Sequence, residues 1–158
     1  NRPGASGALD ASPRGGEPGF VKVRDAHTLL IPDSPGNNRL DTLENIVQTG
    51  QIGLLFMVPG VDETLRVNGT AVLSTAQDEI ALTTDEHRVP KAVIKVTVEA
   101  AYLHCAKAFL RSKLWEATSL VPRDTLPTSR KMMADQSGIS LPGPDTREAM
   151  LKRYSPDL

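Results

Sequence analysis

Two stretches of alternating apolar and polar side chains limit what this chain can fold into. They run from Thr64 to Leu73 and from Ala92 to Cys105. A period of two residues is that of a β-strand with one buried face. The alternation therefore predicts two half-buried strands, with these side chains pointing inward: Leu65, Val67, Ala71 and Leu73 in the first, and Ile94, Val96, Val98, Ala100 and Tyr102 in the second.

Shorter patterns add three strands and a helix. The apolar runs 20–23 and 28–31, separated by Asp25-Ala26-His27, predict a hairpin, and the apolar run 52–58 predicts a buried strand. Residues 39–49 predict a short amphipathic helix that stops at Gly50, with an apolar stripe of Leu40, Leu43, Ile46 and Val47. About five strands without a long helical crossover favour a mainly β protein, a small antiparallel barrel rather than a βαβ fold.

The rest of the chain is less regular. Residues 74–90 are polar and mixed, and residues 106–115 fit a short helix. Beyond Glu116 the sequence is rich in proline until two short helices, the second at about residues 146–154. A length of 158 residues suits one domain. We expect residues 1–138 to form it, with residues 139–158 as a C-terminal extension of the same domain.

Composition excludes several classes of protein. With 18 basic and 19 acidic residues the net charge is −1, so we expect neither a nucleic acid nor a membrane surface as partner. No apolar run approaches the roughly 18 residues of a membrane span. The single Cys105 excludes an internal disulfide and predicts a reducing, cytoplasmic location. The three histidines lack the spacing of metal ligands, so we expect no metal site.

Two segments near the N-terminus carry groups that could bind phosphate. Residues 35–39 lead into the predicted helix, whose free N–H groups and dipole attract anions, and Arg39 could add a bidentate contact. An ordinary capped helix with an exposed arginine is the alternative. If a strand ends at Ser12 and Arg14, their hydroxyl and guanidinium could reach one ligand; otherwise they form a surface turn.

Two further segments carry cations. Arg66 lies mid-strand on the polar face, where a charge has to be solvated, paired with a neighbouring carboxylate, or bound to a ligand. Lys107, Arg111 and Lys113 lie close in sequence to Trp115. This cluster suits a polyanionic ligand with a flat ring, or equally a solvated helix face beside a core tryptophan.

In their order along the chain, these stretches resemble the FMN-binding, pyridoxamine 5′-phosphate oxidase-like family, and within it a bacterial subgroup. Each motif is weak alone, but their number and order over about residues 2–138 make the resemblance specific. The stretches are Ser12-Pro-Arg-Gly, Gly19-Phe-Val, Leu29-Leu-Ile-Pro-Asp, Pro35-Gly-Asn-Asn-Arg-Leu-Asp, Gly53-Leu-Leu-Phe-Met-Val-Pro-Gly, Thr64-Leu-Arg-Val-Asn-Gly and His104-Cys-Ala-Lys-Ala-Phe-Leu-Arg-Ser-Lys-Leu-Trp.

The resemblance implies a six-stranded, antiparallel, Greek-key split β-barrel that forms a homodimer with FMN at the subunit interface. It implies an FMN-dependent oxidoreductase whose substrate is unknown, since the pyridoxal-phosphate-binding residues of the true oxidases have no match here. A non-catalytic split barrel that binds flavin, haem or deazaflavin is the alternative. The helix and first strand with which the family begins have no counterpart, because this chain starts where that strand would end.

The resemblance also implies roles for individual residues. The FMN phosphate would be held by Arg14, Asn38 and Arg39. The isoalloxazine ring would lie near Ser12 and near Ile31-Pro32-Asp33. Thr64 occupies a position that often reaches the flavin, and Arg66 follows two residues later. The second subunit would contribute Lys107, Arg111, Ser112 and Trp115.

Overall fold

The structure, a computed structural model, describes residues 9–33, 40–86, 88–139, 142–143 and 146–155. The chain divides between Ser112 and Lys113 into two compact units, each considered by itself below. The expected single domain with an extension after residue 138 stays a prediction.

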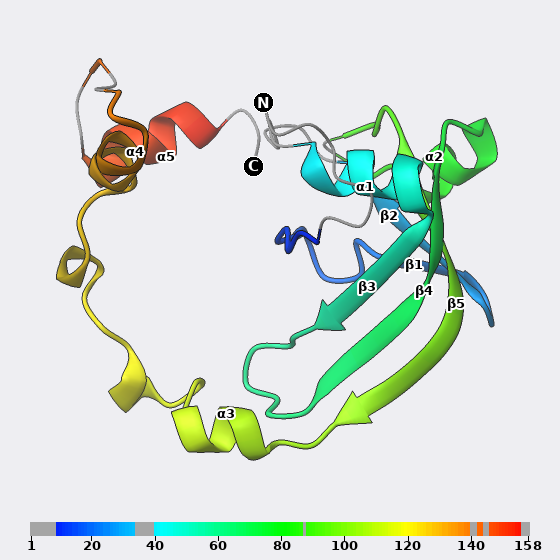
Figure 1. The fold of residues 1–158 in the computed structure, drawn as a ribbon, viewed down its shortest axis with the longest axis horizontal. Helices are drawn as coiled ribbons and strands as arrows, with labels where there is room; N and C mark the ends of the chain where they lie inside the picture. The colour runs from blue at the N-terminus through cyan, green and yellow to red at the C-terminus, as the bar shows by residue number, and fades with distance from the viewer. Residues whose placement is uncertain (1–8, 34–39, 87, 140–141, 144–145, 156–158) are drawn as a thin grey trace. The chain divides into compact units, whose positions relative to one another are not determined.

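A five-stranded antiparallel sheet forms the first unit (Figure 1). Its strands lie in the order β1-β2-β5-β4-β3, so that β1 and β3 are the edges. This confirms the mainly β, antiparallel prediction, and the described residues before β1 add no further strand. The strands are β1 (Lys22–Asp25), β2 (Thr28–Pro32), β3 (Gln51–Phe56), β4 (Thr64–Ser74) and β5 (Val93–His104).

The predicted hairpin and first helix are both present. β1 and β2 are joined at Ala26 and His27, where the Asp25 carboxylate accepts a hydrogen bond from the backbone N–H of His27 at 2.9 Å. Helix α1 (Asp41–Thr49) ends at Gly50, whose φ of 65° is the left-handed conformation that glycine adopts without strain. Its apolar stripe is narrower than predicted, because Ile46 is buried whereas Val47 is 72% exposed.

Two further helices of the first unit differ from what the sequence predicts, and the helices of the second unit agree with it. Helix α2 (Gln77–Thr83) was not predicted, because its buried side chains, Glu79, Ile80 and Thr83, form no apolar stripe. Helix α3 (Lys107–Ser112) is shorter than predicted and is followed by Lys113 with φ 52°. The second unit holds the two short helices expected there, α4 (Ser129–Ser137) and α5 (Arg147–Tyr154), and two 3₁₀ turns, Ala117–Ser119 and Arg123–Thr125.

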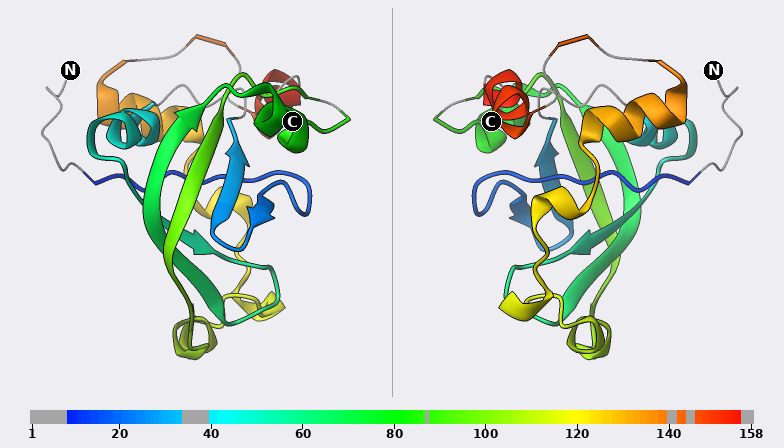
Figure 2. Two further views of the ribbon diagram at one scale, coloured as in Figure 1. Left: turned by 90° about the vertical axis from the view of Figure 1, so that its right-hand side faces the viewer. Right: turned by 90° about the vertical axis from the view of Figure 1, so that its left-hand side faces the viewer.

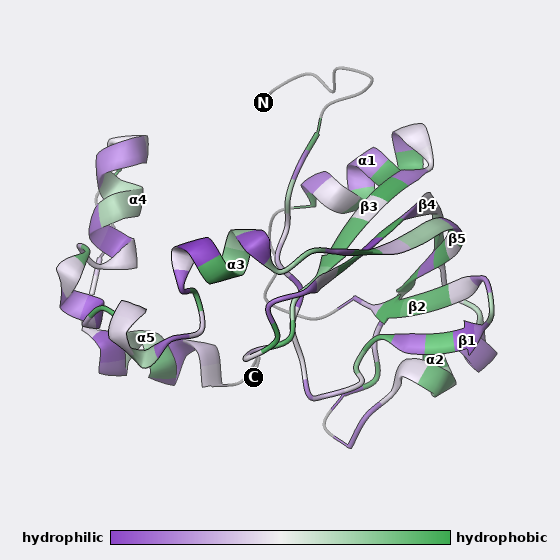
Figure 3. Ribbon diagram, turned by 90° about the horizontal axis from the view of Figure 1, so that it is seen from below, coloured by the Kyte–Doolittle hydropathy of each residue, from purple (hydrophilic) through white to green (hydrophobic). Residues whose placement is uncertain are grey.

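Helices α1 and α2 cover opposite faces of one half of the sheet (Figure 2). Ile46 of α1 packs with Ile31 and Ile94, whereas Ile80 of α2 packs with Leu30 and Val93. Because neighbouring residues of a strand point to opposite faces, Leu30 and Ile31 divide the core into these two clusters. Figure 3 shows that β2 and β3 consist mainly of hydrophobic residues and α4 mainly of hydrophilic ones.

A bulge between β4 and β5 reverses the alternation that the sequence predicted for β5. Asn68 pairs with Ala100 and Gly69 with Val98, so Glu99 is an extra residue in β5. One extra residue moves every later side chain to the other face. The prediction that Ala100 and Tyr102 point into the core is therefore wrong: both lie on the face opposite to Val96 and are exposed.

Beyond this bulge the sheet carries exposed apolar side chains. Leu65, predicted to be inward, is 37% exposed here, and so is Leu73, which lies before the bulge, opposite Ile94. Four apolar side chains at this end are more than half exposed: Leu55, Met57, Val58 and Leu103.

Candidate functional site

Arg66 and Tyr102 face each other on the exposed side of β4 and β5. Arg66 Nη1 donates a hydrogen bond to Tyr102 Oη at 2.9 Å, and its guanidinium carbon lies 5.7 Å from the ring centroid. The charge is thus paired with a tyrosine rather than with a carboxylate. Since a guanidinium has five N–H donors, most of them can still reach an anionic ligand.

Thr64 and His104 extend this group to the end of the strands. Thr64 is buried and lies directly opposite His104 in the register of β4 and β5. The rings of Tyr102 and His104 are 5.5 Å apart. Sequence reasoning missed Tyr102 and His104 as site candidates because it did not place the bulge; Gly69, a glycine inside an alternating strand, is the signal that could have located it.

Helix α3 begins three residues after His104 and brings more cations to this end of β5. Lys107 and Arg111 are exposed. The Ser112 hydroxyl donates to the carbonyl oxygen of Phe109 at 3.1 Å, so its proton is used within the helix. Trp115 is half-buried and belongs to the second unit, so its part in a flavin site stays a prediction.

Ser12 and Arg14 lie in an irregular segment rather than at the end of a strand. Arg14 Nη1 donates to the carbonyl oxygen of Pro13 at 3.2 Å. Upstream, the Asp10 carboxylate accepts hydrogen bonds from Thr42 Oγ1 at 2.5 Å and Asn45 Nδ2 at 2.8 Å. These bonds hold the segment against the first half of α1, the helix whose start was predicted to bind phosphate.

Pro32 and Asp33 lie where β2 ends. Pro32 pairs with Val93, and the backbone N–H of Asp33 donates to the carbonyl oxygen of Ala92 at 3.0 Å. Both residues are half-buried. Asn38 and Arg39 lie outside the described residues, so their predicted role is not addressed by the geometry.

Pro32 and Asp33 lie near one end of β5 and Thr64 and Arg66 near the other, which divides the described candidates of the first unit into two groups. Pro32 is opposite Val93 and Thr64 is opposite His104, the first and last residues of β5. Eleven steps of a β-strand span about 36 Å along the chain, more than the length of a flavin mononucleotide. Group one is Pro32 and Asp33, to which we add Ser12 and Arg14 from the segment next to α1; group two is Thr64, Arg66, Lys107, Arg111 and Ser112.

A buried carboxylate, Glu79, lies outside both groups. It is 2% exposed, and its Oε1 accepts hydrogen bonds from Arg24 and, at 2.8 Å, from Lys95 Nζ. Hydrogen bonds from Lys95 and then Ser74 are the main reasons why the pKa of Glu79 is lowered. Its Oε2 has no hydrogen-bond partner among the described residues. The cluster connects α2 to β1 and β5. No sequence motif could have predicted it, because its members, Arg24, Ser74, Glu79 and Lys95, come from four separate segments.

Two kinds of feature are absent from the described ranges. None of the described helices combines the length and apolarity needed to cross a membrane. Within the same residues, no group of three or more His, Cys, Asp or Glu side chains is placed to hold a metal ion.

Comparison with known families explains the order of motifs in the first unit. The family model described as pyridoxamine 5′-phosphate oxidase matches residues 4–105, more than half of the chain. The chain belongs to the pyridoxamine 5′-phosphate oxidase family. The matched residues of this family member include all five strands, whereas α3 and the second unit follow them.

Solved structures resemble this family member only distantly. HupZ of Group A Streptococcus is 23% identical, with 53% of this chain and 68% of HupZ covered at a TM-score of 0.45. A candidate pyridoxamine 5′-phosphate oxidase of Lactobacillus delbrueckii is 22% identical, with 53% and 68% covered at a TM-score of 0.39. No curated protein matches the chain.

Proposed function

We propose that the protein is an FMN-binding flavoprotein, an oxidoreductase of unknown substrate, which works as a homodimer with the flavin between the subunits. The observation that carries the proposal is the family match over residues 4–105, which contains the whole of the sheet, all of group one, and Thr64 and Arg66 of group two. The proposal includes a six-stranded split barrel, one strand more than the five of the sheet described above. It also includes the cytoplasm as location, because the free, exposed Cys105 suits a reducing compartment.

The separation of the two groups supports a site shared by two subunits. Pro32 and Thr64 of one chain lie at opposite ends of β5, whereas in a dimer Pro32 of one subunit can lie beside Thr64 of the other. Exposed apolar side chains surround group two, and such a surface favours association with a second copy. In the proposed dimer, group one of one subunit faces group two of its partner.

The side chains present fit a flavin mononucleotide. Arg14 and Arg66 offer guanidinium groups of the kind that bind phosphate. Gly53 and Ala100 lie in the same cross-strand row as Asn68, next to the Arg66–Tyr102 pair, and their small side chains leave room for a flat ring against the strands. Bound FMN supplies the hydride or electron chemistry.

The chain's own residues would bind and orient the cofactor and its substrate. The Arg66 bond holds the Tyr102 hydroxyl in place, with its proton available to a ligand, because the oxygen accepts from Arg66 rather than donating to it. His104, beside the same ring, is a second group that can hold a proton. Covering by the partner subunit would exclude water from both.

Flavin content tests the phosphate contacts. Arg14→Ala and Arg66→Ala are each expected to weaken FMN binding about tenfold or more, because a charge-assisted hydrogen bond contributes about 1.5–3 kcal/mol. Affinity is measured by quenching of flavin fluorescence on titration into apoprotein. Lys131→Ala removes an exposed cation of α4, outside the residues that the family model matches, and is expected to leave binding unchanged. A colourless protein that ignores micromolar FMN would contradict the proposal.

Dimerisation has its own test. Leu103→Glu places a carboxylate on a side chain that is 70% exposed, so the fold should tolerate it while the proposed interface does not. We expect the dimer dissociation constant, measured by sedimentation, to rise about tenfold or more, and flavin to be lost with it. Val23→Glu is the matched control, since Val23 is 74% exposed on the edge strand β1. If Leu103→Glu and Val23→Glu had equal dimer dissociation constants, the interface would not include Leu103.

Turnover separates an oxidoreductase from a carrier. Reduction of the bound flavin by a nicotinamide donor, followed by reoxidation with an acceptor, is the expected result. A protein that holds FMN without any turnover would instead be a flavin-sequestering module. Tighter binding of haem or deazaflavin than of FMN would assign the site to those ligands.

A further inference from the structure

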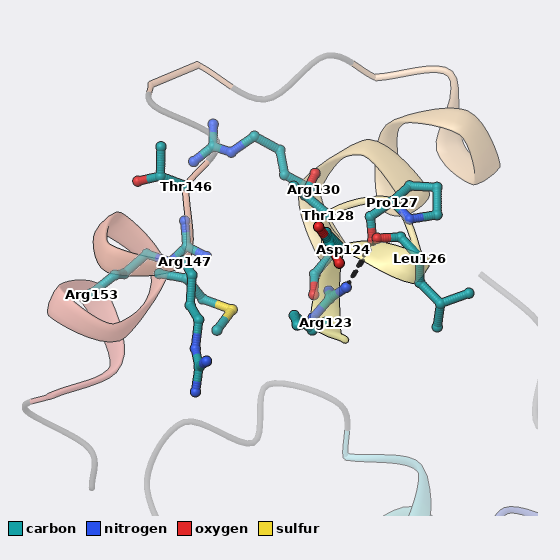
Figure 4. Close-up of a pocket in the computed structure, with 11 residues that line it drawn as sticks. Arg123, Asp124, Leu126, Pro127, Thr128, Arg130, Thr146, Arg147 and Arg153 are labelled. Atoms are coloured by element: carbon teal, nitrogen blue, oxygen red, sulfur yellow. Dashed lines mark hydrogen bonds between the residues drawn. The ribbon is translucent and has the colours of Figure 1, made fainter. Parts of the chain in front are cut away.

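Four arginines line one cleft in the second unit, beyond the residues that the family model matches (Figure 4). The cleft has a volume of about 570 Å³, within the range of small-molecule sites. The arginines are Arg123, Arg130, Arg147 and Arg153, and apolar atoms of Leu126, Pro127 and Met150 also line it.

The arginines create a concentrated positive charge. Asp124 is the one carboxylate among the described residues that line the cleft, so four guanidinium groups leave an excess of three positive charges. Residues 113–158 as a whole hold seven basic and six acidic residues, so this excess comes from where the side chains gather rather than from composition. Like charges held together are unfavourable unless solvent or an anion compensates them.

Two of the four arginines donate hydrogen bonds to backbone carbonyl groups, and the other two line the cleft without such bonds among the described residues. Arg123 donates to the carbonyl oxygens of Leu126 and Pro127, both at 3.2 Å, and Arg130 donates to that of Pro142. Arg153 lies 5.1 Å from the ring centroid of Tyr154. Arg147 makes no hydrogen bond or ion pair within the described residues. Arg147 and Arg153 are therefore the groups best able to bind a ligand.

The surrounding elements fit the same ligand. Arg147, Met150 and Arg153 are spaced three residues apart on α5, so they share one face of that helix. Both α4 and α5 begin at the cleft: Thr128 accepts from the N–H of Lys131 and Thr146 from that of Ala149, each at 3.2 Å. The positive ends of the two helix dipoles add to the guanidinium charge.

We propose that this cleft binds a small organic phosphate monoester. Its dianionic phosphate, with a charge of about −1.5 to −2 at neutral pH, would lie against Arg147 and Arg153 and compensate most of the excess charge. Its apolar part would contact Leu126, Pro127 and Met150. A monocarboxylate of the same shape compensates less of the charge and is expected to bind more weakly.

Calorimetric titration of the full chain, saturated with FMN, tests the site with three probes. Phenyl phosphate is expected to bind, with inorganic phosphate and benzoate each about tenfold weaker or more, since one lacks the apolar part and the other half of the charge. Arg147→Gln is expected to weaken phenyl phosphate about tenfold or more, and Arg147→Lys less. Arg147 makes no hydrogen bond or ion pair within the described residues, so an unchanged melting temperature is expected for both.

Lys152→Gln is the matched control, because it removes the same charge from the neighbouring turn of α5 without lining this cleft. If Lys152→Gln weakened the binding of phenyl phosphate as much as Arg147→Gln, the effect would be one of general electrostatics and the proposal would be overturned. The absence of any binding heat at millimolar phenyl phosphate would also overturn it. If Arg147→Gln lowers FMN content as Arg14→Ala should, the cleft belongs to the flavin site instead. Loss of FMN only in Arg14→Ala leaves the two sites independent.

Discussion

Glu79→Gln is expected to lower the free energy of unfolding by about 3 kcal/mol, the low end of what breaking a buried ion pair costs. The substitution keeps the size of the side chain but removes the charge that Arg24 and Lys95 share. We expect the low end for two reasons. Each cation keeps about a third of its side chain exposed, at 33% and 36%, and can regain water, and Oε2 already lacks a partner among the described residues.

Chemical denaturation at neutral pH measures this loss. Glu44→Gln makes the same chemical change at an exposed position of α1, and we expect its effect to stay within about 0.5 kcal/mol. If the two variants were equally stable, the Glu79 ion pairs would make no net contribution to the free energy of unfolding, which is the case for some buried ion pairs.

The pH dependence of the same variant gives a second check. The pKa of Glu79 is lowered below its ordinary value of 4.5, so the folded protein binds the proton less readily than the unfolded chain. The stability that Glu79 contributes is then fully present above pH 4.5 and is lost as the pH falls through the lowered pKa. The difference between the parent protein and Glu79→Gln should therefore narrow as the solution becomes acidic.

The strands could be predicted from the sequence because alternation is a local signal. β4 and β5 were expected within one residue of where they lie, and Gly50 located the end of α1. Features that depend on the register between neighbouring strands could not be predicted from the sequence. The bulge at Glu99 depends on which residue of β4 lies opposite, and it reversed the faces of Ala100 and Tyr102. Helix α2 was missed for a related reason. A glutamate such as Glu79 is expected on the surface, and its burial is explained only by Arg24 and Lys95, which are distant in sequence.

The candidate site was predictable to a similar degree. Arg66 was singled out because a charge in mid-strand needs a partner, and that partner, Tyr102, was assigned to the core. The separation of Pro32 from Thr64 follows from register and cannot be read from a list of motifs. The arginine cleft of the second unit draws on Arg123 and Arg153, which are thirty residues apart and carry no motif.

Gly69→Ala is expected to destabilise the first unit by about 3 kcal/mol or more, at or above the upper end of overpacking changes. A Cβ at this position would lie 2.0 Å from the carbonyl oxygen of Thr97, which is backbone and cannot rotate away. The glycine allows β4 and β5 to approach closely at the bulge. A methyl group there has to push the strands apart where Gly69 pairs with Val98.

A second glycine of the same sheet provides the matched control. In Gly53→Ala the new Cβ would meet Asn68 Oδ1 at 3.5 Å, an ordinary contact with a side chain, and we expect a change within about 1 kcal/mol. Urea denaturation of both variants gives the comparison. If Gly69→Ala were as stable as Gly53→Ala, the two strands could not approach this closely at residue 69. The bulge would then be absent, and Ala100 and Tyr102 would return to the core face that the uninterrupted alternation predicts. Tyr102 could then no longer share a face with Arg66, so the same measurement tests the geometry on which group two depends.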